Sequence, residues 1–364
     1  MTGPRLDAVV AGYTGVDLAP GFAPEAEPVP LTQLLRPGTL TEVGPLQITP
    51  GGVVPNTGLA MNAFGCRVAL QGLIGEDGLG DLLLGLLEEH GAEVRLRRTK
   101  TAGTAYGIVI APPGSDRVFL ECPGANATFG AEDVDYDLVA RSRLLHFGYP
   151  PLMPRLCADE GAELATLLSR ARGLGVTTSL DMTLPDPEGA TGNVDWRRLL
   201  TRVLPQVDVF APSVEELLVM LAPGEAEHLV AQAAGGDIVD IVPESLCREL
   251  AEEALALGAA IVFLKVGSRG GYCHSRCATP LSSAGDASAD GGVWLPPLPV
   301  DPARFVNACG AGDAAAAGFL TGLLRGDSIA LSGHLAMRAG RDSLYGVDTT
   351  SGLTSWKEMK AEAG

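Results

Sequence analysis

The second half of the chain alternates between short apolar runs and longer segments with helical spacing. From Arg143 onward, each β-branched or aromatic run is followed by a stretch whose apolar residues recur every three to four positions. Strands that alternate with helices usually pair in parallel, because each helix carries the chain back along the sheet. The pattern predicts an α/β fold with a mostly parallel central sheet and helices on both faces. The expected strands are 144–148, 176–182, 207–213 and 260–267, and the expected helices are 163–175, 215–221, 249–258 and 313–326.

The first half of the chain fits this pattern less regularly. Residues 6–12 and 67–75 read as two more strands, and 79–91 predicts a helix that ends near Gly91. The runs 104–111 and 116–122 flank a Pro-Gly turn and predict a β-hairpin that forms a separate flap. A further helix is expected at 57–64, and loops at 20–37, 222–243 (with one short helix) and 276–304.

Composition narrows the class of partner. The formal net charge of −18 argues against a nucleic-acid partner, because the phosphate backbone would be repelled. No run reaches the roughly 18 apolar residues that a membrane span needs, so no membrane association is expected. Seven scattered cysteines do not form a disulfide framework, and they favour a reducing, cytoplasmic location.

The strongest candidate site is the segment 305–320, FVNACGAGDAAAAGFL. Gly310, Ala311 and Gly312 let the backbone approach a ligand closely, and they precede a helix whose first N–H groups have no internal partner. Those groups and the helix dipole stabilise a phosphate. Asp313, in the first turn, can then accept a proton from an attacking hydroxyl, as phosphoryl transfer requires. The alternative is a glycine-rich turn in which Asp313 is an ordinary helix cap.

A second candidate is the segment 49–65, TPGGVVPNTGLAMNAFG. The glycine pair Gly51 and Gly52 allows close contact with a small polar ligand. Asn56 both donates and accepts hydrogen bonds, which suits a sugar hydroxyl. The alternative is a tight turn with Asn56 as a helix cap.

Other nucleotide-binding motifs are absent. The glycines Gly75, Gly78 and Gly80 read G-x-x-G-x-G, not the G-x-G-x-x-G of a dinucleotide site. The sequence contains no G-x-x-x-x-G-K-[ST], so a Walker-type site is also excluded.

In order and spacing, these segments resemble the PfkB, or ribokinase-like, family of carbohydrate kinases along most of the chain. Residues 51–65 with IGEDGLG (74–80) are similar to the first family signature, and NACGAGDAAAAGF (307–319) to the second. Three shorter elements lie between these signatures. APSVEEL resembles the P-N-x-x-E element of the family, and FLKVGSRGGY resembles its nucleotide-side strand and turn. GAN, which follows the predicted hairpin, is a recurrent feature of the family. These three elements are residues 211–217, 263–272 and 124–126.

The resemblance implies a Rossmann-like αβα sandwich with a small β-sheet lid. It implies one kinase domain over residues 1–364, with the lid formed mainly by about 15–50 and 101–128. The activity implied is transfer of a phosphoryl group from ATP to a hydroxyl of a sugar or sugar-like alcohol. Asp313 would be the base and the amides of 310–312 the anion hole.

The resemblance also implies ligand-binding roles. Asp17 matches the hydroxyl-binding acid of the family, and Gly51, Gly52 and Asn56 match its sugar contacts. Asp17 could equally be a surface acid. Glu216 matches the acid that organises Mg²⁺ through water; the alternative is an exposed glutamate at a helix start. The residues expected on the nucleotide side are Lys265, Gly267, Ser268, Gly270 and Asn307, although Lys265 could instead reach solvent from a strand end.

Several positions depart from the family pattern. Asn307 replaces an aspartate, and Ala308 and Cys309 stand at threonine positions, so the charge that would attract a potassium ion is missing. Ser213 replaces the asparagine of P-N-x-x-E, which would loosen Mg²⁺-ATP binding. Val53 replaces the lysine of ribokinases, and HFGYP (146–150) lacks their glutamate, which argues against ribose.

Two other functions remain open from the sequence. The acceptor could be a nucleoside or a vitamin-type alcohol, with Arg117 and Tyr149 as candidate specificity residues. The alternative is that both are ordinary surface or packing residues, which the sequence favours for Arg117. The chain could also be a regulatory homologue that binds ligands without turnover. An extended hairpin exposes strand edges, and because such edges are usually covered, a homodimer through the lid is expected.

Overall fold

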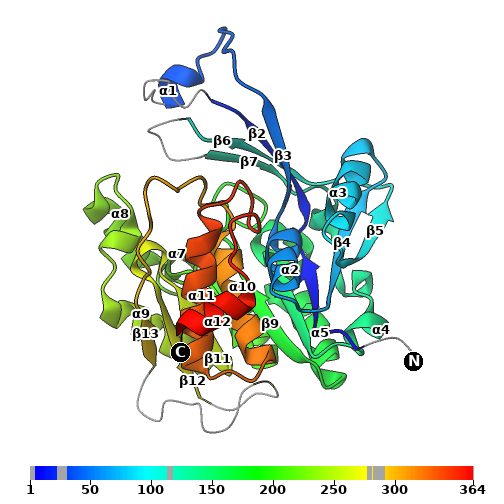
Figure 1. The fold of residues 1–364 in the computed structure, drawn as a ribbon, viewed down its shortest axis with the longest axis vertical. Helices are drawn as coiled ribbons and strands as arrows, with labels where there is room; N and C mark the ends of the chain where they lie inside the picture. Colours follow the sequence, from blue (N-terminus) through cyan, green and yellow to red (C-terminus); the bar gives the residue numbers. More distant parts are fainter. Residues whose placement is uncertain (1–4, 23–30, 113–117, 277–280, 282–291, 364) are drawn as a thin grey trace.

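The computed structural model describes residues 5–22, 31–112, 118–276, 281 and 292–363, which form two β-sheets and their flanking helices (Figure 1). The larger sheet has nine strands in the order β13-β12-β11-β10-β9-β8-β1-β4-β5. The neighbouring strands β11-β10-β9-β8-β1-β4-β5 all run parallel to one another. At one edge, β12 pairs antiparallel with β11, and β13 pairs antiparallel with β12. The predicted Rossmann-like sandwich is therefore confirmed. These strands are β1 (Ala8–Gly12), β4 (Val68–Gly75), β5 (Glu93–Thr99), β8 (Leu144–Gly148), β9 (Thr177–Asp181), β10 (Val209–Phe210), β11 (Ile261–Lys265), β12 (Gly271–Ser275) and β13 (Val293–Leu295).

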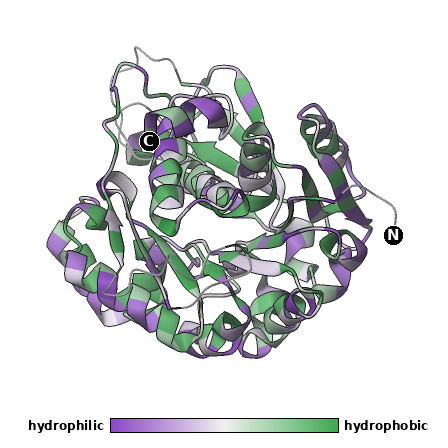
Figure 2. Ribbon diagram, turned by 60° about the horizontal axis from the view of Figure 1, so that its bottom comes forward, coloured by the Kyte–Doolittle hydropathy of each residue, from purple (hydrophilic) through white to green (hydrophobic). Residues whose placement is uncertain are grey.

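Helices pack in two groups around this sheet. In the first group, α2 packs against α10, α10 against α11 and α11 against α12, and α2 also lies against β1 and β4. In the second group, α6 contacts α5, α7 and α9, and α7 contacts α9. Figure 2 shows hydrophobic residues concentrated on the central strands and hydrophilic ones on the outer helices. The helices are α1 (Leu31–Leu34), α2 (Val53–Ala63), α3 (Gly78–Glu88), α4 (Tyr136–Val139), α5 (Pro154–Gly173), α6 (Trp196–Val203), α7 (Val214–Leu221), α8 (Pro223–Ala233), α9 (Glu244–Leu257), α10 (Ala311–Leu324), α11 (Ile329–Ser343) and α12 (Trp356–Ala363).

The small sheet has four strands in the order β3-β2-β6-β7. The predicted hairpin is confirmed as β6 (Tyr106–Ile110) paired with antiparallel β7 (Val118–Cys122). It is joined by β2 (Gly15–Pro20) and β3 (Leu46–Gly51), which the sequence did not mark as strands. All four strands stand away from the larger sheet in Figure 1, and they fall almost entirely within the ranges expected for the lid.

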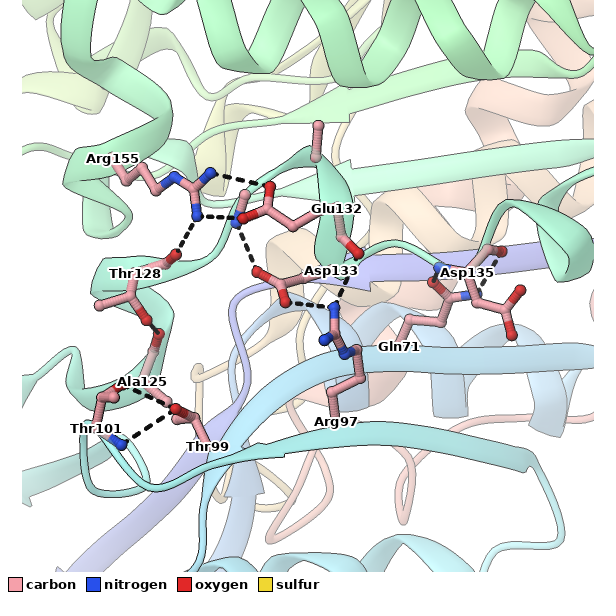
Figure 3. A network of polar contacts seen from close by, with 12 residues as sticks. Gln71, Arg97, Thr99, Thr101, Ala125, Thr128, Glu132, Asp133, Asp135 and Arg155 are labelled. Carbon is pink, nitrogen blue, oxygen red and sulfur yellow. Dashed lines mark hydrogen bonds and ion pairs between the residues drawn. The ribbon is translucent and has the colours of Figure 1, made fainter.

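The small sheet is attached to the body through the segment that follows β7. Asn126, fully buried, donates from Nδ2 to the Thr14 carbonyl at 2.9 Å and accepts from the Thr14 N–H at 3.3 Å. Farther along, Arg97 of β5 bonds Asp133, and Arg155 of α5 bonds Glu132 (Figure 3). These contacts fix the base of the small sheet relative to both β1 and the sheet edge.

Some local expectations were wrong. The helix α2 begins at Val53, before the expected start at residue 57. The short helix expected within the loop at 222–243 is present as α8, which has 11 residues and buries Ala226 and Leu229. The strand β13 lies inside the expected loop at 276–304, of which residues 277–280 and 282–291 lie outside the described part of the chain.

Candidate active site

The residues of the candidate site gather at the carboxyl edge of the parallel strands. Tyr149 directly follows β8, Asp181 ends β9, and Lys265 ends β11. Ser213, just after β10, forms an isolated bridge with Lys265. In open α/β sheets this edge is where ligands bind, because loops and helix starts from different strands converge there.

The start of α10 has the form expected of an anion hole. Gly310 is the N-cap, with φ of 76°, a left-handed conformation that favours glycine. The first helical hydrogen bond runs from the Ala314 N–H to the Gly310 carbonyl at 2.8 Å. Among the described residues, the N–H groups of Gly312 and Asp313 have no acceptor, and that of Ala311 makes only a long 3.4 Å bond to Ala308. These amides can therefore bind an anion.

Asp313 is buried beside these amides, with an exposed fraction of 2%. Its Oδ2 accepts hydrogen bonds from Asn56 Nδ2 at 3.0 Å and from the Tyr149 hydroxyl at 2.7 Å. Its Oδ1 accepts from Thr57 Oγ1 at 3.2 Å. Burial raises the pKa of the Asp313 carboxyl, and the charge of Lys265 and these donors partly offset that effect. A raised pKa suits a carboxylate that must take up a proton.

A second layer of contacts holds these donors in place. Thr349 Oγ1 donates to Asn56 Oδ1 at 2.9 Å, so the Asn56 amide is fixed with its NH₂ group toward Asp313. The same Thr349 hydroxyl lies where a side chain at Gly310 would project. Packing of α2 against α10 brings Asn56 and Asp313 together.

Tyr149 reaches Asp313 from a strained backbone position. Its φ of 66° and ψ of 41° are left-handed, which costs a bulky residue about 1–3 kcal/mol. It lies between Gly148 and Pro150, and its ring is 6.5 Å from that of Tyr13 between centroids. The structure thus places a residue that the sequence marked only as a specificity candidate in direct contact with the predicted base.

Asp17 and the glycine pair lie on the small-sheet side of the site. Asp17 is in β2, half-buried, and its carboxylate fills the space that a side chain at Gly51 would need. Gly52 has φ of 90° and caps α2, where a Cβ would press on the Tyr13 carbonyl at 2.7 Å. Burial and the nearby charge of Asp313 raise the pKa of Asp17 to about 6. Tyr13 donates to the exposed Glu121 of β7.

Lys265 and Glu216 form the other side of the site. Lys265 Nζ contacts both carboxylate oxygens of the fully buried Asp181, at 2.8 and 2.9 Å. Glu216 closes a capping box with Ser213: its Oε2 accepts from the Ser213 N–H at 2.7 Å, and Ser213 Oγ accepts from the Glu216 N–H at 3.2 Å. Ser213 therefore keeps the helix-capping ability of the asparagine it replaces.

The remaining predicted nucleotide-side residues have structural partners. Gly270, with φ of 97°, is pressed against the end of β13, and Ser268 Oγ bonds Asp240 at 3.2 Å. Gly267, with φ of 44°, packs against Val239. Asn307 Oδ1 accepts from the Cys309 N–H at 2.9 Å, and its Nδ2 donates to the Val347 carbonyl at 3.4 Å. These contacts shape the turns, and roles in nucleotide binding stay predictions.

Sequence reasoning missed five residues that complete the site: Tyr13, Thr57, Glu121, Asp181 and Thr349. A polar residue at the carboxyl end of a predicted strand was a usable signal for Asp181. Thr57 adjoins a residue already singled out, whereas Tyr13, Glu121 and Thr349 have no motif that marks them. Arg117, the other specificity candidate, lies outside the described residues.

Two other kinds of feature are absent from the described part of the chain. No group of three or more His, Cys, Asp or Glu side chains there could hold a metal ion. No described helix is both long and apolar enough to cross a lipid bilayer.

Comparison with known proteins identifies the family. Residues 26–352 match the pfkB family of carbohydrate kinases. The chain belongs to this family. It is accordingly a sugar kinase of the PfkB type, a phosphotransferase with an alcohol group as acceptor.

Sequence relatives are distant. An uncharacterized sugar kinase from Archaeoglobus fulgidus is 24% identical over 279 residues, which cover 76% of this chain and 91% of that protein. A probable fructokinase from Arabidopsis thaliana is 25% identical over 141 residues, covering 38% of this chain but only 40% of the relative. Several plant fructokinases are therefore matched over about half of their length or less.

Solved structures share the fold over nearly the whole chain. A probable sugar kinase from Rhizobium etli superimposes with a TM-score of 0.72 at 18% identity, covering 100% of this chain and 99% of that one. An Arabidopsis thaliana ribokinase complexed with ribose and ATP gives 0.70 at 17% identity, with 99% of each chain covered. At such identities the match demonstrates the fold alone.

Proposed function

We propose that this PfkB-type kinase transfers the γ-phosphoryl group of ATP to a hydroxyl of a sugar or sugar-like alcohol, with Asp313 as catalytic base. The observation that carries the proposal is the position of the Asp313 carboxylate. It is buried at a helix start with free amides, and three donors from α2 and the end of β8 orient it.

In the proposed reaction, Asp313 accepts the proton of the acceptor hydroxyl as that oxygen attacks the γ-phosphorus. The bond between the γ-phosphorus and the bridging oxygen breaks, and ADP leaves with the electron pair. The amides of Gly310, Ala311 and Gly312 stabilise the negative charge on the phosphoryl oxygens during transfer. Catalysis then depends on positioning and electrostatics, for which a rigid helix start is well suited.

Magnesium enters the proposal as a companion of ATP. Both oxygens of Asp181 and of Asp313 are taken by protein donors, and one oxygen of Glu216 caps α7. These residues fit an ion held mainly by nucleotide phosphates and water, as Mg²⁺ prefers, with Glu216 acting through water. When bound, the ion neutralises phosphate charge. We place the nucleotide near Lys265, Gly267, Ser268, Gly270 and Asn307, and the acceptor near Asp17, Gly51, Gly52 and Asn56.

The proposal is tested by incubating the chain with Mg²⁺-ATP and a panel of sugars, nucleosides and vitamin-type alcohols. We expect ADP release that depends on one class of acceptor, the sugars. If only a nucleoside is phosphorylated, the proposed substrate class is wrong, but the proposed mechanism is unaffected. ATP binding without turnover of any acceptor would contradict the proposal and favour a regulatory protein.

Asp17 gives a pH-dependent prediction. Its carboxyl group, with a pKa of about 6, accepts stronger hydrogen bonds from the acceptor hydroxyl when it is ionised than when it is protonated. The KM for the acceptor should therefore fall as pH rises through about 6. In Asp17→Asn, KM should no longer depend on pH in this range. At neutral pH it should be about 10–100-fold higher than in the unaltered chain, which is the usual contribution of a hydrogen bond to a charged group. An unchanged pH profile of KM in that variant would remove Asp17 from the acceptor site.

Potassium activation is not expected. Asn307 carries no charge, and both ends of its amide are engaged by backbone groups, so no carboxylate attracts a monovalent cation at this position. We expect the same kcat in potassium and in choline salts of equal ionic strength. A clear rise in kcat with potassium alone would contradict this prediction.

We also propose that the small sheet acts as a lid and pairs in a homodimer. Its edge strand β3 carries exposed Leu46 and Ile48, and edge strand β7 carries exposed Leu120. Sedimentation at micromolar concentration should give a dimer, and Ile48→Asp should give a monomer of unchanged melting temperature. A monomer before any substitution would exclude the lid interface. A cytoplasmic location stays a prediction.

A further inference from the structure

The proposed mechanism leaves one buried ion pair unexplained. Asp181 is fully buried, and the Lys265 side chain is 12% exposed. Such pairs seldom add stability over an apolar pair of similar volume, because both ions lose their hydration. A lysine and an aspartate at the ends of two strands that face the proposed phosphate site therefore call for a functional reason.

The Lys265 side chain lies directly beside the start of α10. A Cβ built at Gly312 would be 3.6 Å from Lys265 Nζ and 3.7 Å from its Cδ, with no closer neighbour. The ammonium group is thus within van der Waals reach of the position whose N–H has no partner among the described residues.

The charges around this ammonium group would otherwise repel a phosphate. Asp181, Glu216 and Asp313 are all buried, and Lys265 is the cation that acts on each of them. Burial opposes the charge on Lys265, yet these three carboxylates raise the pKa of its ammonium above the ordinary value. The group is therefore charged at neutral pH.

The hydrogen-bond capacity of Lys265 is only partly used. An ammonium has three donors. Two are directed at the two oxygens of Asp181, and among the described residues no acceptor takes the third. One N–H is consequently left for a ligand without disrupting the ion pair.

We propose that Lys265 is a further catalytic residue that contacts the transferring phosphoryl group, and that Asp181 is a positioning residue that holds its ammonium. The inference rests on the proposed function, in which the phosphoryl group passes beside the amides of residues 310–312. Lys265 would oppose the charge that builds on the phosphoryl oxygens, while Asp181 restricts the side chain to one direction. No bond to Lys265 forms or breaks.

Single substitutions give the first part of the test. Lys265→Met removes the charge at nearly constant length, and we expect kcat to fall about 10²–10³-fold, as for loss of one transition-state donor, with the acceptor KM unchanged. Lys265→Arg keeps the charge and should retain more activity. Asp181→Asn frees the ammonium and should lower kcat by a smaller factor, about tenfold.

A double variant separates catalysis from structure. Lys265→Met leaves Asp181 buried without a partner, so a purely structural role for the lysine would also reduce activity. Lys265→Met/Asp181→Asn removes both charges and should recover the melting temperature without recovering kcat. In the Lys265→Met background, Asp181→Asn should cost no further activity. Recovery of kcat to the level of Asp181→Asn would overturn the proposal.

A binding measurement keeps the inference distinct from the proposed function. Calorimetry with Mg²⁺ and either ADP or a non-hydrolysable ATP analogue measures the preference for the γ-phosphate. We expect Lys265→Met to lower that preference about tenfold or more, because a charge-assisted hydrogen bond is lost. An unchanged preference would overturn this inference even in an active kinase. Absence of acceptor-dependent ADP release from the unaltered chain, with the preference intact, would instead overturn the proposed function alone.

Discussion

Replacing Asp313 by asparagine is expected to lower kcat about 10²–10⁴-fold, the usual contribution of a general base. Asparagine has the same shape but does not accept the acceptor's proton at neutral pH. The KM of the Asp313→Asn variant for ATP should stay similar to that of the unaltered chain, because the amides at the start of α10 are unchanged. The measurement is steady-state kinetics with the acceptor that the panel identifies.

The stability of Asp313→Asn provides the internal control. Burial disfavours the Asp313 charge, so a neutral side chain should leave the melting temperature unchanged or raise it. The Thr57 hydroxyl can rotate to accept from the new NH₂ group. Lost activity in a well-folded protein would assign the loss to chemistry, and retained turnover would defeat Asp313 as the base.

The second large effect is expected at Gly310. In Gly310→Ala, the φ of 76° costs an L-residue about 1–2 kcal/mol, and the new Cβ would overlap the Thr349 hydroxyl. This overlap can be relieved only if the start of α10 or the Thr349 side chain moves. Because Thr349 fixes Asn56, which in turn bonds Asp313, both the amides and the base should be displaced. We expect kcat/KM for ATP to fall at least about 10²-fold, comparable to losing one anion-hole donor.

Gly312→Ala is the matched control, two residues away in the same turn. Its φ is not left-handed, and its Cβ would meet Lys265 at 3.6–3.9 Å, an ordinary contact distance. Its melting temperature should therefore match that of the unaltered chain, whereas Gly310→Ala should melt lower. Equal stability and equal kcat/KM for the two variants would contradict a special role for the Gly310 conformation.

Features encoded over a few neighbouring residues could be predicted from the sequence. The alternation after Arg143 indicated the parallel sheet, and the small-residue start of α10 indicated both the free amides and Asp313. The same approach did not predict β5, which contains three arginines in seven residues, or β13, a strand of three residues in an irregular stretch. Short or polar strands form because a neighbouring strand provides backbone hydrogen-bond partners, and the local sequence does not reveal that neighbour.

The sequence alone therefore determined the fold class, the family and the helix start that carries Asp313, because periodicity, glycine and helix polarity act locally. Only the tertiary structure decided how that carboxylate is held and what lies beside it. Thr349 and Asn56 are separated by 293 positions, and Lys265 and Asp181 by 84. Such contacts depend on strand order and helix packing, which bring distant residues to one edge of the sheet, and no short-range pattern encodes them.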